Sequence, residues 1–379
     1  MKSAAAYADD AGLAAAAEIA LRSSLKVQEG EKLLIVANPE REVLEIASAL
    51  YDAAAALGAR PTLVVQPVKG QMDDAEDAVI SAFESQPDVL LSISACKLGK
   101  DPGGIATPYE WDGVFYDHVF HYQMRGAKTL RAFWSPSITR AMFAKTVPID
   151  YAELRSRCRL VKAALDGASS VRVTNPGGTD LRIGLAGREA KCDDGDYSSP
   201  GSGGNLPAGE VYISPELATA EGIIVFDGSI SLADRDILIR DPIRCRLSGG
   251  FVVEIEGGTE AEALRAALES GAAGARRMAA EGKLSADKAA AYARNARNLG
   301  ELGIGLNPKA EVVGNMLEDE KVYGTCHFAI GFNYDQDARA LIHLDCLVKR
   351  PTVTALMPDG TELELMRDGI LAESMDPAS

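Results

Sequence analysis

The chain of 379 residues is long enough for two domains, and 47% of its residues are hydrophobic, as in globular proteins with sizeable cores. Its 55 acidic and 39 basic side chains give a net charge of -16, which repels nucleic-acid phosphates and anionic lipid headgroups. We therefore expect no nucleic-acid partner and no membrane partner.

The cysteines and the N-terminal segment favour a cytoplasmic protein. The six cysteines are spread singly, without the dense spacing of small disulfide-bonded secreted domains. The alanine-rich N-terminus carries Asp9, Asp10 and Glu18, where a signal peptide needs an uninterrupted apolar core. The longest apolar runs are strand-sized and fall well below the roughly 20 residues that span a bilayer. The sequence thus predicts a cytoplasmic location and reduced thiols.

Helical and strand patterns alternate over the first part of the chain. The predicted order is a helix near 8–24, a strand at 32–37, a helix near 41–57, a strand at 61–65, a helix near 73–85 and a strand at 89–94. Short, almost continuously apolar strands between amphipathic helices indicate a parallel sheet covered on both faces, in an open doubly wound α/β domain. No glycine-rich phosphate-binding string follows these strands, so a nucleotide is not indicated.

The pattern changes near residue 165 to short alternating strands separated by glycine turns. Two helices are predicted within this β-rich part, near 259–281 and 285–299, and strands resume around HFAIGF, ALIHLDCLV and TVTALM. The predicted organisation is an α/β N-terminal domain at 1–164 followed by an α+β, β-rich C-terminal domain at 165–379.

Histidine is scarce, and two of the four histidines lie beside candidate metal ligands. His343 and Asp345 form an HxD pair in ALIHLDCLV, and strand spacing places both side chains on one face. Imidazole and carboxylate together suit zinc, cobalt, manganese or iron(II). The alternative interpretation is a strand histidine that is hydrogen-bonded to a neighbouring acid.

Three further residues are candidate ligands. His327 follows an acidic turn in LEDEKVYGTCHFAIGFNY and either binds a metal or fills a core position. Glu210 and Glu301 each follow a glycine and adjoin apolar, β-prone residues. A carboxylate in such surroundings is costly unless it is paired or bound to a metal. The alternative for each glutamate is a position at a strand edge that faces water.

The segments around these candidate ligands resemble those of a known enzyme family. The segments NLPAGEVYISPE, LGELGIGLNP, GTCHFAIGFNY and HLD, in this order and spacing, resemble the metal-site segments of the thermophilic metalloaminopeptidases, the aminopeptidase T and S family, which is leucyl aminopeptidase-like. The resemblance covers most of the chain. It implies two adjacent divalent ions, zinc, cobalt or manganese, held by two glutamates, two histidines and an aspartate beside a catalytic tyrosine. On this chain the implied ligands are Glu210, Glu301, His327, His343 and Asp345, and the implied tyrosine is Tyr334.

The resemblance implies an aminopeptidase, or a related amide hydrolase, that releases N-terminal amino acids from peptides through metal-activated water. Tyr334 would donate to the tetrahedral oxyanion. Glu318 and Glu320 are candidates for a general acid or base, with plain turn acids as the alternative. The implied partners are a small peptide or amide substrate and a second copy of the chain, because that family forms dimers. The residues do not fix the substrate side chain.

Two other functions fit the same residues. The chain also resembles the dihydroxypyridine ring-cleaving dioxygenases, which bind one iron(II) through two histidines and an aspartate, here His327, His343 and Asp345. Those enzymes have histidine in place of Glu301 and lack Glu210, so the sequence favours the hydrolase. The third interpretation is a non-catalytic binding protein on an enzyme-like fold.

Overall fold

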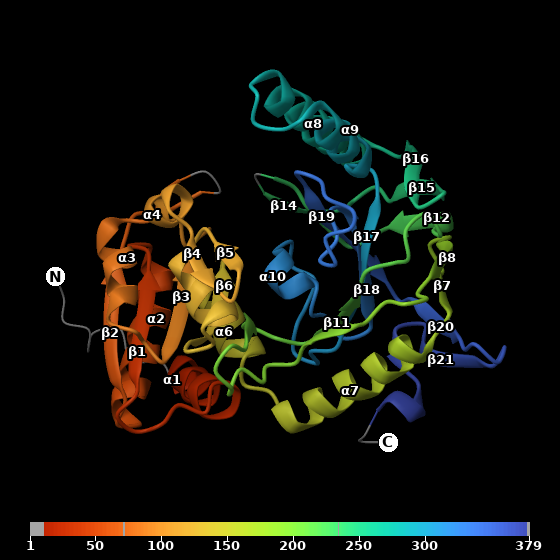
Figure 1. Cartoon of the computed structure of the whole chain (residues 1–379). Helices are drawn as coiled ribbons and strands as arrows, with labels where there is room; N and C mark the ends of the chain where they lie inside the picture. The colour runs from red at the N-terminus through yellow and green to blue at the C-terminus, as the bar shows by residue number, and fades with distance from the viewer. Residues whose placement is uncertain (1–10, 71–72, 234, 377–379) are drawn as a thin grey trace. The chain divides into compact units, whose positions relative to one another are not determined.

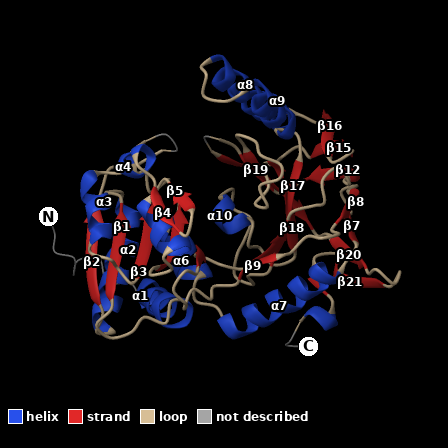
Figure 2. Cartoon of the chain, viewed as in Figure 1, coloured by secondary structure: helices blue, strands red, loops and turns tan. Residues whose placement is uncertain are grey.

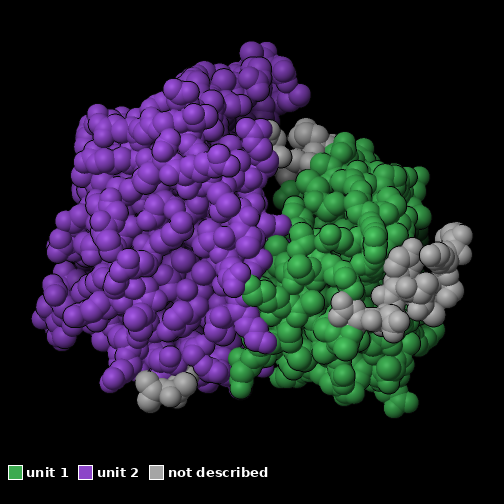
Figure 3. Space-filling view, turned by 180° about the vertical axis from the view of Figure 1, so that it is seen from behind, with its two compact units in different colours: residues 1–151, 193–208 green, residues 152–192, 209–379 purple. Residues whose placement is uncertain are grey.

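The computed structural model describes residues 11–70, 73–233 and 235–376, and the chain divides into two compact units (Figure 3). Unit 1 comprises residues 1–151 and 193–208, and unit 2 comprises 152–192 and 209–379. The predicted order, an α/β region with a parallel sheet followed by a β-rich region, is confirmed (Figure 2). The predicted domain boundary between 164 and 165 stays a prediction.

Unit 1 is built on a parallel sheet whose strands follow the order β10-β6-β3-β1-β2 (Figure 1). Its strands are β1 (Lys32–Ala37), β2 (Arg60–Val65), β3 (Val89–Ser94), β6 (Arg131–Pro136) and β10 (Gly203–Asn205). Strand β3 is buried at every position, and only the first residue of β1 is exposed. Such continuous burial is the property of a parallel sheet that is covered on both faces.

The helices of unit 1 pack in two groups. In the first group, α1 (Ala11–Ile19), α2 (Arg41–Ala56) and α6 (Arg140–Thr146) contact one another, and in the second, α3 (Asp77–Glu84) contacts α5 (Val119–His121). The short helix α4 (Pro102–Ala106) lies between α3 and α5 in the chain. Phe83 of α3 packs with Leu34, Leu90 and Ala132 of the sheet. The predicted helix near 8–24 is helical throughout its described part but changes to a π-helix at Ala20–Ser24. Its residues 8–10 lie outside the described residues.

Unit 2 contains two larger sheets. Within the described residues, seven strands follow the order β14-β13-β19-β18-β17-β11-β9, and eight follow the order β16-β15-β12-β8-β7-β20-β21-β22. The first sheet consists of β9 (Lys191–Asp193), β11 (Glu210–Ile213), β13 (Ser229–Ser231), β14 (Asp236–Leu238), β17 (Leu299–Gly305), β18 (Thr325–Gly331) and β19 (His343–Lys349). The second consists of β7 (Ser170–Thr174), β8 (Asp180–Gly184), β12 (Glu221–Phe226), β15 (Ile243–Ser248), β16 (Phe251–Glu256), β20 (Thr352–Leu356), β21 (Glu362–Arg367) and β22 (Ile370–Leu371). Neighbouring strands from β11 to β13 through β17, β18 and β19 are antiparallel.

Among the described residues, four α-helices accompany these sheets: α7 (Tyr151–Gly167), α8 (Thr259–Ala280), α9 (Ala286–Asn295) and the single turn α10 (Met316–Asp319). The predicted helix near 285–299 therefore ends too late, because Leu299 already begins β17. Gly271 of α8 lies close to the side chain of Ile342, just before β19, so α8 supports the start of that strand. Within the described part of the chain, no helix combines the length and the apolar character that a membrane crossing requires.

Candidate metal centre

One face of the seven-stranded sheet gathers the predicted ligands. Glu301 on β17 lies opposite Ala329 on β18, and Ala329 lies opposite Asp345 on β19, so these three residues form one row across the sheet. Residues two positions apart in a strand share a face. His327 precedes Ala329 by two positions, and His343 precedes Asp345 by two positions. The imidazoles of both histidines therefore project from the face that carries Glu301 and Asp345.

Glu301, His343 and Asp345 form a first group, whose donor atoms all lie within 4.8 Å of one another. His343 Nε2 is 3.3 Å from Asp345 Oδ1. The other ring nitrogen, Nδ1, lies 2.9 Å from the carbonyl oxygen of Phe332. A carbonyl only accepts, so Nδ1 carries the proton, and in the neutral ring Nε2 keeps its lone pair for a metal ion.

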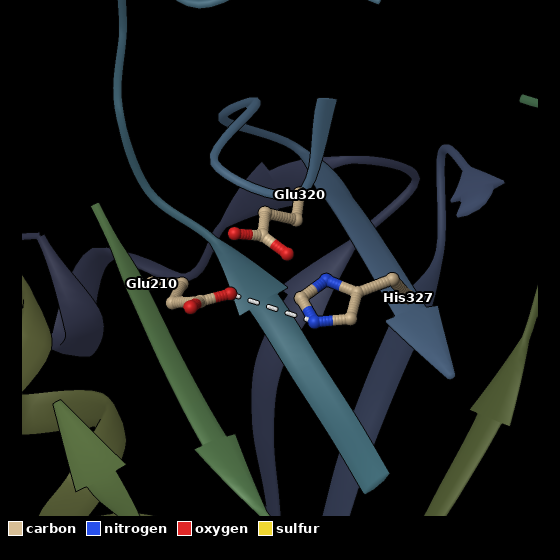
Figure 4. A group of neighbouring side chains, drawn as sticks. All are labelled: Glu210, Glu320 and His327. Carbon is tan, nitrogen blue, oxygen red and sulfur yellow. Dashed lines mark ion pairs between the residues drawn. The ribbon is translucent and has the colours of Figure 1, made fainter. Parts of the chain in front are cut away.

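Glu210, Glu320 and His327 form a second group whose donor atoms also lie within 4.8 Å of one another (Figure 4). The two carboxylates and the imidazole turn toward the same space, and the dashed line in Figure 4 joins His327 Nε2 to Glu210 Oε2 over 3.5 Å. The same nitrogen lies 3.2 Å from Glu301 Oε1. His327 therefore connects the second group to the first.

Lys321 enters the second group and was not predicted from the sequence. Its side chain is fully buried, and Nζ donates to Glu210 Oε1 and to Glu320 Oε1, each at 2.6 Å. The string LEDEKVYG reads as a charged surface turn, so no pattern in the sequence indicates a buried lysine. The sequence predicted Glu320 only as one of two candidate residues for a general acid or base, together with Glu318.

The acids just before Glu320 have structural roles. Glu318 accepts a hydrogen bond from the backbone N–H of Glu311 at 2.9 Å. Asp319 accepts from the backbone N–H groups of Val313 and Gly314, at 2.7 and 3.0 Å. These bonds hold the loop before α10 and direct both carboxylates to backbone donors. Of the acidic run, only Glu320 joins a metal-binding group within the described residues.

Glycines make room for the large polar side chains. A β-carbon on Gly303 would lie 2.1 Å from Nε2 of His327, and a β-carbon on Gly305 would lie 2.2 Å from the carbonyl oxygen of Val322. The first glycine gives space to the imidazole, and the second lets the turn that carries Lys321 lie against β17. The segment GELGIG thus provides the carboxylate of Glu301 and, at Gly303 and Gly305, two positions without a side chain where neighbouring groups approach the strand closely.

Charges within the site shift the pKa values of the histidines and acids. Burial disfavours the imidazolium of His343, but the charge of Asp345 outweighs it and raises the pKa of His343 to about 10. Burial acts in the same way on His327, where the hydrogen bond to Glu301 raises the pKa to about 9. Burial raises the pKa of Glu320 to about 8, although Lys321 opposes it. The metal-free site is therefore adapted to bind positive charge.

The donor set fits a divalent metal ion. Glu301 Oε2 and His327 Nδ1 are buried and have no hydrogen-bond partner among the described residues. Glu301 is 4% exposed and His327 is fully buried. Buried polar atoms without partners are costly, and a bound cation removes that cost for a carboxylate oxygen. Two carboxylates and one imidazole in the first group suit iron(II), manganese or zinc.

Tyr334 lies beside the first group, outside both sets of candidate donors. Its ring centroid is 5.1 Å from that of His343, 5.5 Å from that of Phe332 and 5.6 Å from that of Tyr212. Phe332 also lies against His343, at 4.6 Å between centroids. The three aromatic rings form a wall at one side of the Glu301, His343 and Asp345 group.

Comparisons with known proteins show the family. A family model described as NicX, 2,5-dihydroxypyridine 5,6-dioxygenase, matches residues 13–363. A 2,5-dihydroxypyridine 5,6-dioxygenase of Pseudomonas putida KT2440 is 29% identical over 141 residues, which are 37% of this chain and 38% of that relative. The match thus spans well under half of the curated relative.

Two solved structures share the fold. The structure of 2,5-dihydroxypyridine dioxygenase from Pseudomonas putida KT2440 has a TM-score of 0.68 and 18% identity, and the match covers 96% of this chain and 98% of that chain. Wild-type AmpT from Thermus thermophilus has a TM-score of 0.63 and 21% identity, and the match covers 95% and 99%. At these identities the two structures show the fold alone.

The interpretation as an aminopeptidase, with its hydrolase and protease activities, is wrong, because the family model that covers residues 13–363 describes an oxidoreductase. The role of Tyr334 as a donor to the oxyanion of amide hydrolysis falls with it. The resemblance to the aminopeptidases reflects a shared fold, which AmpT also has. The chain belongs to the enzyme family of the 2,5-dihydroxypyridine 5,6-dioxygenases.

Proposed function

We propose that the chain is an iron(II)-dependent dioxygenase that opens the ring of a dihydroxylated pyridine or a close analogue. The observation that carries the proposal is the family match over residues 13–363, combined with a partly buried group of candidate metal donors on one sheet face. Such a reaction adds both atoms of one dioxygen molecule to the ring carbons of the bond that breaks.

Glu301, His343 and Asp345 would hold the ion. Three protein donors leave coordination positions for other ligands, as in the non-haem iron(II) oxygenases. Iron(II), when bound, supplies the redox chemistry that dioxygen needs to react with a closed-shell ring. The Phe332 carbonyl fixes the tautomer of His343, so that Nε2 faces the other two donors.

The aromatic wall supports a flat, aromatic substrate. Tyr334 is 47% exposed, so one part of its ring is accessible while its other contacts hold it against His343 and Tyr212. Aromatic rings prefer offset-stacked or edge-to-face contacts at centroid separations of about 4.5–7 Å. A pyridine ring beside Tyr334 would therefore be held next to the Glu301, His343 and Asp345 group.

Oxygen uptake tests this function directly. The protein is stripped with chelator, reloaded anaerobically with iron(II), zinc or manganese, and mixed with 2,5-dihydroxypyridine in an oxygen-electrode cell. We expect uptake of about one dioxygen per ring lost, followed by the decay of the aromatic absorbance, with the iron-loaded protein alone. The matched control is Glu301→Gln, which keeps the side-chain volume and removes the charge.

A fully iron-loaded wild type that consumes no dioxygen with dihydroxylated pyridines or with the corresponding dihydroxybenzenes would contradict the proposal. Equal oxygen uptake by the wild type and by Glu301→Gln, at equal iron content, would place the reaction elsewhere in the chain.

A further inference from the structure

We infer that the ammonium group of Lys321 occupies the place of a second metal ion, so that each chain holds one divalent ion and one built-in cation. The inference rests on the proposed metal-dependent function and concerns the second group of donors. That group has the carboxylates and the imidazole of a metal site, yet its centre already contains a positive charge.

The contacts of Lys321 carry the inference. Nζ lies 2.6 Å from Glu210 Oε1 and 2.6 Å from Glu320 Oε1, so it lies between the two carboxylates that a metal ion would bridge. Short charge-assisted hydrogen bonds of this kind are about twice as strong as neutral ones. The lysine is fully buried, and an unpaired ammonium there would be very costly. One oxygen of each carboxylate is therefore paired with Lys321.

The backbone fixes Lys321 in this place. Its carbonyl oxygen accepts a hydrogen bond from the N–H of Asn307 at 2.8 Å, and its own N–H donates to the carbonyl of Glu318 at 2.9 Å. The missing side chain of Gly305 lets this turn approach β17, because a β-carbon there would lie 2.2 Å from the Val322 oxygen. These contacts hold the backbone of Lys321 in the turn beside β17, from which its side chain reaches Glu210 and Glu320.

The charge of Lys321 makes the second group less favourable for a divalent ion than the first group. A divalent ion among Glu210, Glu320 and His327 would lie next to the buried ammonium, and like charges at such separations repel strongly away from water. The first group contains no lysine or arginine ion pair within the described residues. A single ion therefore binds in the first group, where Glu301 Oε2 has no hydrogen-bond partner among those residues.

His327 supplies an independent observation that ligand space exists in the second group. The ring is fully buried, and Nδ1 has no hydrogen-bond partner in the described part of the chain. Figure 4 shows this ring edge turned toward Glu320. When the ammonium of Lys321 is removed, Glu210, Glu320 and His327 remain as three donors that suit a divalent ion.

Metal counting tests the inference without any use of catalysis. Chelator-stripped protein is titrated with manganese and with zinc, and the bound ions are counted by elemental analysis and by calorimetry. We expect about one ion per wild-type chain at saturation and about two per chain in Lys321→Met. Lys321→Arg keeps the positive charge and should stay near one. Lys69→Met is the matched control, because Lys69 pairs with Glu76 in unit 1.

Two bound ions per wild-type chain would overturn the inference, and this measurement requires no variant. A folded Lys321→Met protein that still binds one ion would overturn it as well. Should Lys321→Met fail to fold, the wild-type count and Lys321→Arg decide: about one ion in each supports the inference, and two ions in either overturn it. If one ion binds but no ring is cleaved, the proposed reaction fails and this inference stands.

Discussion

Gly303 lies directly opposite His327 on the neighbouring strand, and the imidazole fills the space that a β-carbon would occupy. Gly303→Ala should therefore displace His327, because the new β-carbon would lie 2.1 Å from Nε2. We expect a loss of about 1–3 kcal/mol in the free energy of unfolding, as for overpacked cores, together with weaker metal binding. Urea unfolding and metal titration measure the two effects.

Gly103→Ala is the control for this substitution. Gly103 lies in the short helix α4 (Pro102–Ala106), and its nearest neighbour would be Asp101 Oδ1 at 3.4 Å, an ordinary contact. Alanine should be tolerated there or slightly stabilising. Equal stability of Gly303→Ala and the wild type would contradict the close contact between position 303 and the imidazole of His327.

Asp345→Asn should weaken metal binding by about 100-fold or more, since a neutral amide replaces a partly buried carboxylate donor at nearly constant volume. The thermal stabilisation that saturating metal gives to the wild type should shrink in parallel. Calorimetric titration gives the affinity, and thermal unfolding with and without chelator gives the stabilisation. Asp359→Asn, at an exposed turn that accepts from the N–H of Thr361, should change neither quantity.

The stability of the metal-free protein should fall as the pH rises from about 7 to 10. The pKa values of His327 and His343 are raised from 6.5 to about 9 and 10, so the folded state holds protons that the unfolded state has released. Their stabilisation is complete below pH 6.5 and is lost as the pH rises through the folded pKa values. The raised pKa of Glu320, about 8, acts in the same direction from 4.5 upward.

Urea unfolding in chelator at pH 6.5, 8 and 9.5 checks this dependence, and His343→Asn should flatten it. Metal affinity should follow the opposite trend and increase with pH, because the ion must displace the proton of His343. Stability that is constant or rising over this range in chelator would mean that the two imidazoles are neutral in the folded protein.

Tyr334→Ala should raise the KM for a dihydroxylated pyridine by roughly 3- to 10-fold, the magnitude of one lost aromatic contact. Tyr334→Phe keeps the ring and should keep KM near the wild-type value. Metal content should be the same in all three proteins, because Tyr334 lies outside both donor groups. A larger effect on kcat than on KM, shared by Tyr334→Phe, would assign a chemical role to the hydroxyl.

Sequence patterns predicted the elements that are either continuously apolar or strictly periodic. Strands β1, β2 and β3 and helix α8 have these signals, and the structure confirms them within a few residues. The strand LGELGIG was assigned to no predicted strand, because a glycine-rich string with a glutamate has low β-propensity. In the fold this strand, β17, is buried at every position and pairs with β11 on one side and β18 on the other.

The site was only partly visible in the sequence. The HxD spacing identified His343 and Asp345 as neighbours on one face of a strand, and the structure places them so. Lys321 was missed because it lies beside three acids in a string typical of solvated turns, whereas its burial depends on Gly305, distant in sequence. Local pattern also could not separate hydrolase from dioxygenase, since one fold carries both.

Strand β19 is the last strand of its sheet to be synthesised, and it supplies two of the three donors in the first group. During translation the ribosome releases β17, with Glu301, well before His343 and Asp345 exist outside the exit tunnel. A metal ion held by Glu301, His343 and Asp345 would therefore be bound only after β19 has joined the sheet.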